Sequence, residues 1–418
     1  MRQQFWRFRH GLRLRDERAI KLELDLMWVK QNSIGGPATT AAFASALRPR
    51  CATRTSRRQG TMAGVVMVGK GEYNSASSGQ TRSLMDMLPR IVECARHRQG
   101  PIAIADYGCS QGGAAHAVFK QIISACPNRN MVLFLVDQPG NDWDTVRQIF
   151  SEWTVEPSSS TCFLSSGDVV AAVSNPSTTP IRVFLCGVSF YEQVLPSGAV
   201  DIAISGTAIH WMSTRPRIGP ENGILGGVSF RNLPAELRRD AEKSAADDWK
   251  CFLGHRNREL KSGGHMFFVI PAYDASFVEC PFTWADYSDF MQRSTADLLK
   301  NGAITVEEAV KAQAPVYMRS RAEFEAPFKS AACSSVDGMK LTGIDLRALP
   351  NTEWDEDAER FAKKHQRAIL AVMDNLWQNA FSQTVNDLLR RRLLDEIKSN
   401  PSPHKVNWLQ AYITISKH

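Results

Sequence analysis

Short apolar runs alternate with segments of helical periodicity between Ile102 and Ile270. The segments between these runs, such as His116–Cys126 and Ala241–Lys261, carry apolar residues at helical spacing. The runs themselves predict five strands, at Ile102–Asp106, Met131–Val136, Ile181–Leu185, Asp201–Ser205 and His265–Ile270. Strands that alternate with helices form a parallel sheet whose two faces are both covered. We therefore expect an α/β fold.

After Pro271 the pattern turns helical, and the chain closes on a further strand at 408–415. The helices are expected at 282–301, 305–312 and 356–398. A helical region between sheet strands suggests a cap over the carboxyl edge of the sheet. The predicted organisation is a core at 62–275, a cap at 276–400 and a terminal strand at 401–418, with 213–250 as a candidate contribution to the cap.

Residues 1–61 differ from the remainder in charge. They carry eleven Arg and two Lys against four acidic residues, a net charge of +9 that leaves −2 for the rest of the +7 chain. The body therefore lacks the basic footprint of a nucleic-acid-binding domain. We expect this segment to be a disordered tail or a gene-model extension that precedes Met62 or Met67. Organellar targeting is the alternative, although four acids between Asp16 and Asp25 disfavour it.

Cysteines, apolar runs and histidines narrow the class of protein further. The nine cysteines are scattered and contain no C-x-x-C pair, which favours reduced thiols and a cytoplasmic setting. The longest apolar run, 266–270, ends at Pro271 and is far shorter than the roughly 18–20 residues of a membrane span. No spacing of histidines is typical of a metal site, so no metal is predicted.

The sharpest local motif is the turn Asp106-Tyr-Gly-Cys-Ser-Gln-Gly-Gly113 after the first strand. Its G-x-x-x-G-G spacing is not the G-x-G-x-x-G that seats a pyrophosphate, which disfavours a nicotinamide-dependent oxidoreductase. S-adenosylmethionine has no phosphate but carries an ammonium and a sulfonium, so an acid at the turn suits it. Asp137 ends the second strand, where a carboxylate can accept hydrogen bonds from ribose hydroxyls of either cofactor.

Five motifs occur in order along the chain: Tyr73-Asn-Ser-Ala-Ser-Ser-Gly-Gln80, Ile104-Ala-Asp-Tyr-Gly-Cys-Ser-Gln-Gly112, Asp137-Gln-Pro-Gly-Asn-Asp142, Ser189-Phe-Tyr-Glu-Gln-Val-Leu-Pro196 and His210-Trp211. Together they resemble the SABATH family of carboxyl methyltransferases, over roughly Val66 to the C-terminus. The resemblance implies a Rossmann-like, doubly wound, mostly parallel sheet of the class I methyltransferase type with a helical cap. It also implies S-adenosylmethionine as cofactor, a small carboxylic acid as substrate, and a homodimer.

The resemblance assigns roles to individual positions. Gln80 and Trp211 would hold the substrate carboxylate through the side-chain amide and the indole N–H, with Thr207 and His210 in the same pocket. Ser189 and Phe190 would flank the adenine. The remaining cofactor contacts would come from Tyr73, Ser77, Asp106, Gly108, Asp137 and Gln138.

Two positions depart from the family pattern. Ala114 stands where Asn is frequent, and Thr207 replaces a frequent Tyr, which shrinks one wall of the acid pocket. These departures leave a second hypothesis open, in which the chain is a non-catalytic protein of the same fold that binds the cofactor or a small ligand. His210 is not needed as a base, because a carboxylic acid is already ionised at neutral pH. The pair Asp247-Asp248 is interpreted as solvated or helix-positioning surface.

Overall fold

The structure, a computed structural model, describes residues 65–156, 181–215, 235–330 and 332–418, so the predictions for residues 1–61 lie outside it. Its strands are β1 (Ile102–Tyr107), β2 (Met131–Asp137), β3 (Thr154–Glu156), β4 (Ile181–Gly187), β5 (Val200–Gly206), β6 (Leu260–Tyr273), β7 (Arg319–Ser320), β8 (Met339–Pro350) and β9 (Val406–Lys417). Its α-helices are α4 (Glu72–Ala76), α5 (Ser78–Met85), α6 (Leu88–His97), α7 (Gly113–Ala125), α8 (Trp143–Ile149), α10 (Ala235–Glu259), α11 (Ala285–Lys300), α12 (Val306–Lys311), α13 (Arg321–Lys329), α14 (Ala358–Ala380) and α15 (Gln383–Ser399). Two 3-10 turns, η3 (Ser334–Val336) and η4 (Ser402–His404), complete the described elements.

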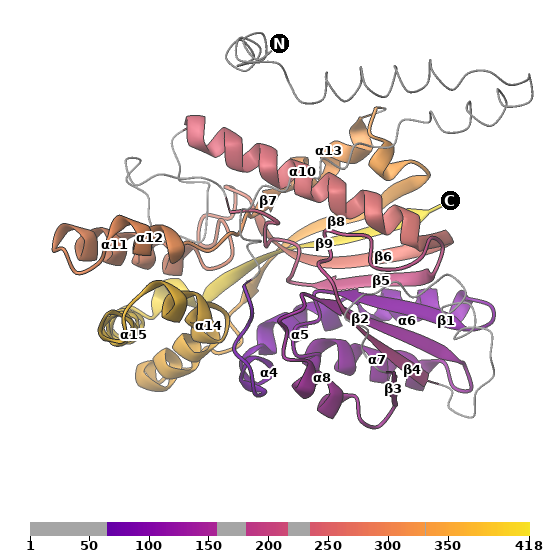
Figure 1. Cartoon of the computed structure of the whole chain (residues 1–418), viewed down its shortest axis with the longest axis horizontal. Helices are drawn as coiled ribbons and strands as arrows, with labels where there is room; N and C mark the ends of the chain where they lie inside the picture. Colours follow the sequence, from indigo (N-terminus) through magenta and orange to yellow (C-terminus); the bar gives the residue numbers. More distant parts are fainter. Residues whose placement is uncertain (1–64, 157–180, 216–234, 331) are drawn as a thin grey trace, which may run out of the picture. The chain divides into compact units, whose positions relative to one another are not determined.

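The main sheet has the strand order β3-β4-β2-β1-β5-β6-β9-β8, and β7 adds to the end of β6 (Figure 1). The strands from β3 to β6 pair in parallel, whereas β9 and β8 pair antiparallel. The chain leaves β1 toward β2 and β4, then crosses back to β5 and β6. This reversal places a ligand crevice beyond the carboxyl ends of β1 and β5. The doubly wound α/β fold class is confirmed.

The side chains of the central strands point alternately to the two faces of the sheet, and both faces are covered by other elements. In β1, Ala103, Ala105 and Tyr107 join one buried cluster with Trp249 of α10 and residues of β6 and β9. The intervening residues of β1 join a second cluster with α5, α6 and α7. Because successive side chains of a strand point to opposite faces, a strand buried on both faces has to be apolar throughout. This is why these strands were visible in the sequence.

The helices after β6 enclose a third apolar cluster, built from α11, α12, α14, α15 and Trp408. The expectation of helices alone at 276–400 is wrong in two places: the short β7 pairs with the end of β6, and β8 pairs along β9 at the edge of the sheet. Exposed and half-buried residues alternate along β8, and its exposed positions include Lys340, Asp345 and Arg347. Such a half-solvated edge strand alternates apolar and polar residues and lacks the continuous apolar run by which the central strands are recognised. The single helical run expected at 356–398 is also divided, because Ser382 caps α15 by accepting a hydrogen bond from Val385 N.

Candidate active site

The turn after β1 needs glycine for two separate reasons. Gly108 has φ of 90°, in the left-handed region where side chains are disfavoured. A Cβ on Gly108 would lie 2.2 Å from the Cβ of Ala208 and 3.6 Å from the ring of Phe190. The turn therefore meets the loops that follow β4 and β5 at the carboxyl edge of the sheet. Without a side chain at Gly108 these loops pack closely around the turn, and we call the turn with its two flanking loops the cradle.

Two carboxylates stand at this edge. Asp106 is buried, and its Oδ1 has no hydrogen-bond partner among the described residues. Burial, with a smaller effect from Asp137, raises the pKa of Asp106 to about 8. Asp137 accepts hydrogen bonds from Ser110 N at 2.7 Å and Gln138 N at 2.8 Å, yet burial still raises its pKa to about 6. A buried, unpaired carboxyl beside a second carboxylate fits the ammonium and sulfonium of S-adenosylmethionine.

Tyr73 joins the carboxylate pair to the expected acid pocket. Its hydroxyl lies within hydrogen-bonding reach of the side chains of Gln80 and Thr207, and burial raises its pKa above the usual range. Gln80 is buried in α5, and its Oε1 has no partner among the described residues. Thr207 takes φ of 54° and donates to Gly206 O at 2.8 Å. The structure thus brings Tyr73, a predicted cofactor contact, next to Gln80 and Thr207 of the predicted acid pocket.

The segment before α5 is fastened onto the glycine turn by side chains that the sequence reasoning missed. Asn74 accepts from Gly113 N at 3.1 Å and donates to Gln111 O at 3.2 Å, while Asn74 N donates to Gln111 Oε1. Gln111 also donates to Val68 O at 2.8 Å. Gln138, a predicted cofactor contact, donates through its side-chain amide to Val65 O at 2.6 Å. These contacts hold Tyr73 over the turn.

Ser77, Ser189 and Phe190 lie at the same edge of the sheet. Ser77 is buried between α4 and α5 and donates to Asn74 O at 3.3 Å. Ser189 accepts from Tyr191 N at 3.2 Å. The half-buried Phe190 packs edge-on against Phe252 of α10, with ring centroids 6.0 Å apart. Phe190 next to Gly108 agrees with the predicted adenine side of the cradle.

The loop after β5 carries His210 and Trp211. Trp211 forms an isolated bridge with Val316, and His210 O accepts from Tyr317 N at 2.8 Å. Burial and the charge of Arg319 lower the pKa of His210 to about 3, so its imidazole is neutral and a weak base. Among the described residues no hydrogen bond joins Trp211 to Gln80. The two lie on separate elements, Gln80 in α5 and Trp211 in the loop after β5, and Trp211 packs with Tyr73 on the third apolar cluster.

One cluster of metal-ligating residues lies outside this site, between α11, α14 and η4, and the sequence gave no sign of it. His404 Nδ1 is in direct contact with a carboxylate oxygen of Asp286. The amide of Asn351 is oriented by its bonds from Glu353 N and to His404 O, and it lies 3.2 Å from His365 Nδ1. His365 Nδ1 therefore accepts, which places the proton on Nε2. The cluster thus joins Asp286 and His365 of the predicted cap to His404 in η4, and the absence of a metal stays a prediction.

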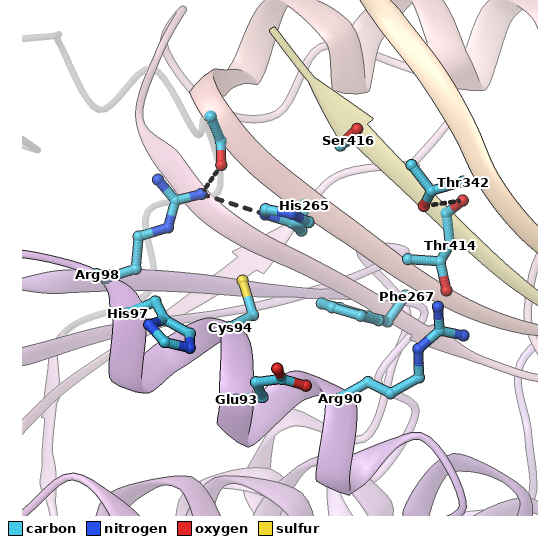
Figure 2. A pocket seen from close by; sticks show the side chains of 11 residues that line it. Arg90, Glu93, Cys94, His97, Arg98, His265, Phe267, Thr342, Thr414 and Ser416 are labelled. Carbon is cyan, nitrogen blue, oxygen red and sulfur yellow. Dashed lines mark hydrogen bonds between the residues drawn. The ribbon is translucent and has the colours of Figure 1, made fainter.

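A cleft of about 460 Å³ also lies away from this site, between α6 and the strands β6, β8 and β9 (Figure 2). It opens beside Gly263 and His265, near the start of β6, whereas the glycine turn lies at the carboxyl ends of β1 and β5. Arg98 faces it and pairs with Asp201 at 3.9 Å. None of the site residues predicted from the sequence lines this cleft. It is therefore separate from the candidate active site.

A doubly wound sheet with a glycine cradle and two acids at its carboxyl edge defines a class of proteins that bind adenosine-containing cofactors. Residues 64–418 match the family described as SAM dependent carboxyl methyltransferase, and the chain belongs to this family. Its cofactor is S-adenosylmethionine, and it methylates small-molecule carboxylic acids. The SABATH resemblance is thereby confirmed.

Relatives of known activity match over most of their length. Anthranilate O-methyltransferase 3 of Zea mays is 22% identical over 81% of this chain and 93% of its own. A benzoic acid/salicylic acid carboxyl methyltransferase of Petunia hybrida is 22% identical over 76% of this chain and 85% of its own. A loganic acid methyltransferase structure with SAH has a TM-score of 0.64 at 17% identity, covers 84% of this chain and 98% of its own, and shows the shared fold. No described helix is long and apolar enough to cross a membrane.

Proposed function

We propose that this chain forms methyl esters by direct in-line transfer to the carboxylate of a small organic acid held by Gln80 and Trp211. S-adenosylmethionine supplies an electrophilic methyl group when bound. Asp106 and Asp137 bind its positive charge and ribose, and Gly108 and Phe190 form the cradle for its adenosine. The observation that carries this proposal is the buried, unpartnered Oδ1 of Asp106 close to Tyr73, whose hydroxyl also reaches the side chains of Gln80 and Thr207.

The proposed residues position the acid rather than activate it. The amide of Gln80 and the indole N–H of Trp211 each donate to one carboxylate oxygen without a full counter-charge. A carboxylic acid is ionised at neutral pH, so no proton has to be removed. The low pKa of His210 agrees with this mechanism, because a neutral imidazole of such weak basicity is a poor general base. Proximity, alignment and exclusion of water would supply the rate, a contribution of up to roughly 7–11 kcal/mol.

We further propose that α11, α12, α14 and α15 form the cap over the acid. The segment 65–76 supports this, because Asn375 of α14 donates to Val66 O at 2.9 Å and Ala371 O accepts from Val68 N at 3.1 Å. The cap thereby contacts the segment that carries Tyr73. A homodimer is part of the proposal, tested by light scattering. A cytoplasmic setting is supported by the described cysteines, which are all free.

Trp211→Phe tests the assignment of the acid pocket. The substitution keeps an aromatic ring but removes the indole N–H. Because one hydrogen bond to the charged carboxylate is lost, the KM for the acid is expected to rise about tenfold and kcat to fall. The Kd of S-adenosylhomocysteine, measured by calorimetry, should stay within twofold. Trp153→Phe is the matched control, because Trp153 packs against His116 and Phe150, on the other elements α7 and α8. A loss of cofactor affinity in Trp211→Phe would place Trp211 in the cofactor site instead.

A further inference from the structure

Four buried charged side chains, three on α10 and one, Arg319, on β7, link α10 to the loops that form the two halves of the candidate active site. The loop at 189–195 carries Ser189 and Phe190, on the adenine side. The loop at 207–213 carries Thr207, His210 and Trp211, on the acid side. Helix α10 packs on the sheet face that holds the first apolar cluster (Figure 1). None of its buried charges belongs to the mechanism above.

The adenine-side loop is held by an ion pair at the carboxyl end of α10. Arg256 and Glu259 have fully buried side chains and pair at 2.8 Å. Arg256 donates to Phe190 O at 2.7 Å and to Glu192 O at 2.8 Å. Glu259 accepts from the backbone N–H of Val194 at 2.6 Å and of residue 195 at 3.0 Å. Two carbonyls and two amides of one loop are thus satisfied by a single pair.

The same pair reaches the end of β1. Glu259 accepts from the hydroxyl of Tyr107 at 2.6 Å, and the guanidinium of Arg256 lies 4.1 Å from the centroid of the Tyr107 ring. Tyr107 directly follows Asp106 and precedes Gly108. The charges of Arg256 and Glu259 therefore fix the adenine loop relative to the glycine turn. A buried pair in which both terminal guanidinium nitrogens and both carboxylate oxygens are hydrogen-bonded in this way has a defined geometry.

The acid-side loop is held by a different part of α10. Asp248 is buried, unlike its exposed neighbour Asp247, and accepts from Ser213 N at 2.8 Å. Arg319, also buried, donates to Ala245 O of α10 at 2.7 Å and to Ile209 O of the loop at 2.9 Å. The interpretation of Asp248 as a solvated surface residue is therefore wrong. The alternative interpretation, that it positions the helix, agrees with these contacts.

We propose that α10 is a positioning helix with two separate functions, in which Arg256 and Glu259 set the cofactor loop and Asp248 with Arg319 sets the acid loop. The part of this proposal that concerns Arg256 and Glu259 rests on the proposed function, in which residues 189–190 contact the adenine. Tyr191 of the first loop joins the two by donating to Trp211 O at 2.5 Å. These residues act through the loops and touch neither ligand. The consequence is that the two binding functions can be weakened independently by substitutions on one helix.

Arg256→Lys and Asp248→Asn are the matched variants that test this division. Both preserve the size of the side chain, the first losing the planar fork and the second the charge. Hydrogen exchange measured by mass spectrometry would follow the amides of 189–195 and 207–213, and calorimetry would give the Kd of S-adenosylhomocysteine. Arg256→Lys should accelerate hydrogen exchange at 189–195. It should also raise the Kd of S-adenosylhomocysteine about tenfold, because one charge-assisted hydrogen bond is lost. Asp248→Asn should accelerate exchange at 207–213 and leave the Kd within twofold.

The contrary outcome is equally defined. If both variants accelerate hydrogen exchange equally in both loops, or raise the Kd of S-adenosylhomocysteine equally, α10 only stabilises the fold. Either result would overturn the proposal. If Arg256→Lys does not fold, Tyr191→Phe gives an independent test, because it removes one hydroxyl. It should accelerate exchange at 207–213 and not at 189–195, and the reverse pattern would refute the division. None of these readouts uses an acid, so failure of the proposed esterification would leave them unaffected.

Discussion

Binding of the cofactor should release close to one proton at neutral pH, and most of it should come from Asp106. With its pKa at about 8, this carboxyl is mostly protonated at pH 7 in the free protein. A positively charged ligand beside Asp106 stabilises the carboxylate, so the proton leaves on binding. The expected release from Asp106 is roughly 0.9 proton at pH 7, with about 0.1 more from Asp137, whose pKa of about 6 leaves it mostly ionised.

The corresponding free energy follows from the same pKa. Ionising Asp106 at pH 7 costs about 1.4 kcal/mol, and at pH 9 this cost nearly disappears. The affinity contributed by Asp106 should therefore rise about tenfold between pH 7 and pH 9. Titration of the ligand's own amino group opposes this gain at high pH. The proton count at pH 7 is for that reason a cleaner quantity than the affinity.

Calorimetry in two buffers of different ionisation enthalpy measures this count directly. S-adenosylhomocysteine, which keeps the ammonium, serves as the ligand at pH 7. Asp106→Asn is the control, since it retains the shape of the side chain but cannot titrate, and its release should fall to about 0.1 proton. A wild-type release below roughly 0.3 proton, or the same release in Asp106→Asn, would refute the assignment of a protonated Asp106 to the free site.

Two further predictions concern stability and the turn. The raised folded-state pKa of Asp106 means that the free protein binds one more proton than the unfolded chain between about pH 4 and pH 8, so its free energy of unfolding should fall with pH across that window, by up to ~1.4 kcal/mol per unit. Denaturant titrations should show a shallower fall in Asp106→Asn, and parallel curves would contradict the shift. Gly108→Ala should lower stability by a few kcal/mol, from both the clash with Ala208 and the left-handed φ. Ala208→Gly in the same chain should restore only the clash component in thermal unfolding, and full recovery would show that backbone strain is absent.

The parts of the fold and site that the sequence predicted are those specified locally. Strands such as β1 and β2 are apolar up to Asp106 and Asp137 because both faces are covered. The glycine turn is specified by residues adjacent in sequence, and Asp106 and Asp137 mark the ends of two such strands. Each of these features is complete within a window of a few residues.

The parts that the sequence did not predict depend on contacts between distant residues. Asn74 meets Gln111 across 37 positions, and Arg256 meets Phe190 across 66. In the sequence, Asn74 and Arg256 look the same as solvent-exposed residues of their types. Only their burial against distant parts of the chain makes them positioning groups. Asp248 shows this most clearly, because its neighbour Asp247 has the same chemistry and is exposed.

The central claim, methyl transfer to a carboxylate, is tested most directly with the purified chain, methyl-labelled S-adenosylmethionine and a panel of acceptors. The panel spans benzoic, phenylpropenoic, indole-acetic, farnesoic and medium-chain fatty acids, with a phenol and an amine for comparison. The account predicts base-labile label on at least one class of acid and none on the phenol or the amine. Label confined to the phenol or the amine would contradict it and would make the neutral His210 a candidate base.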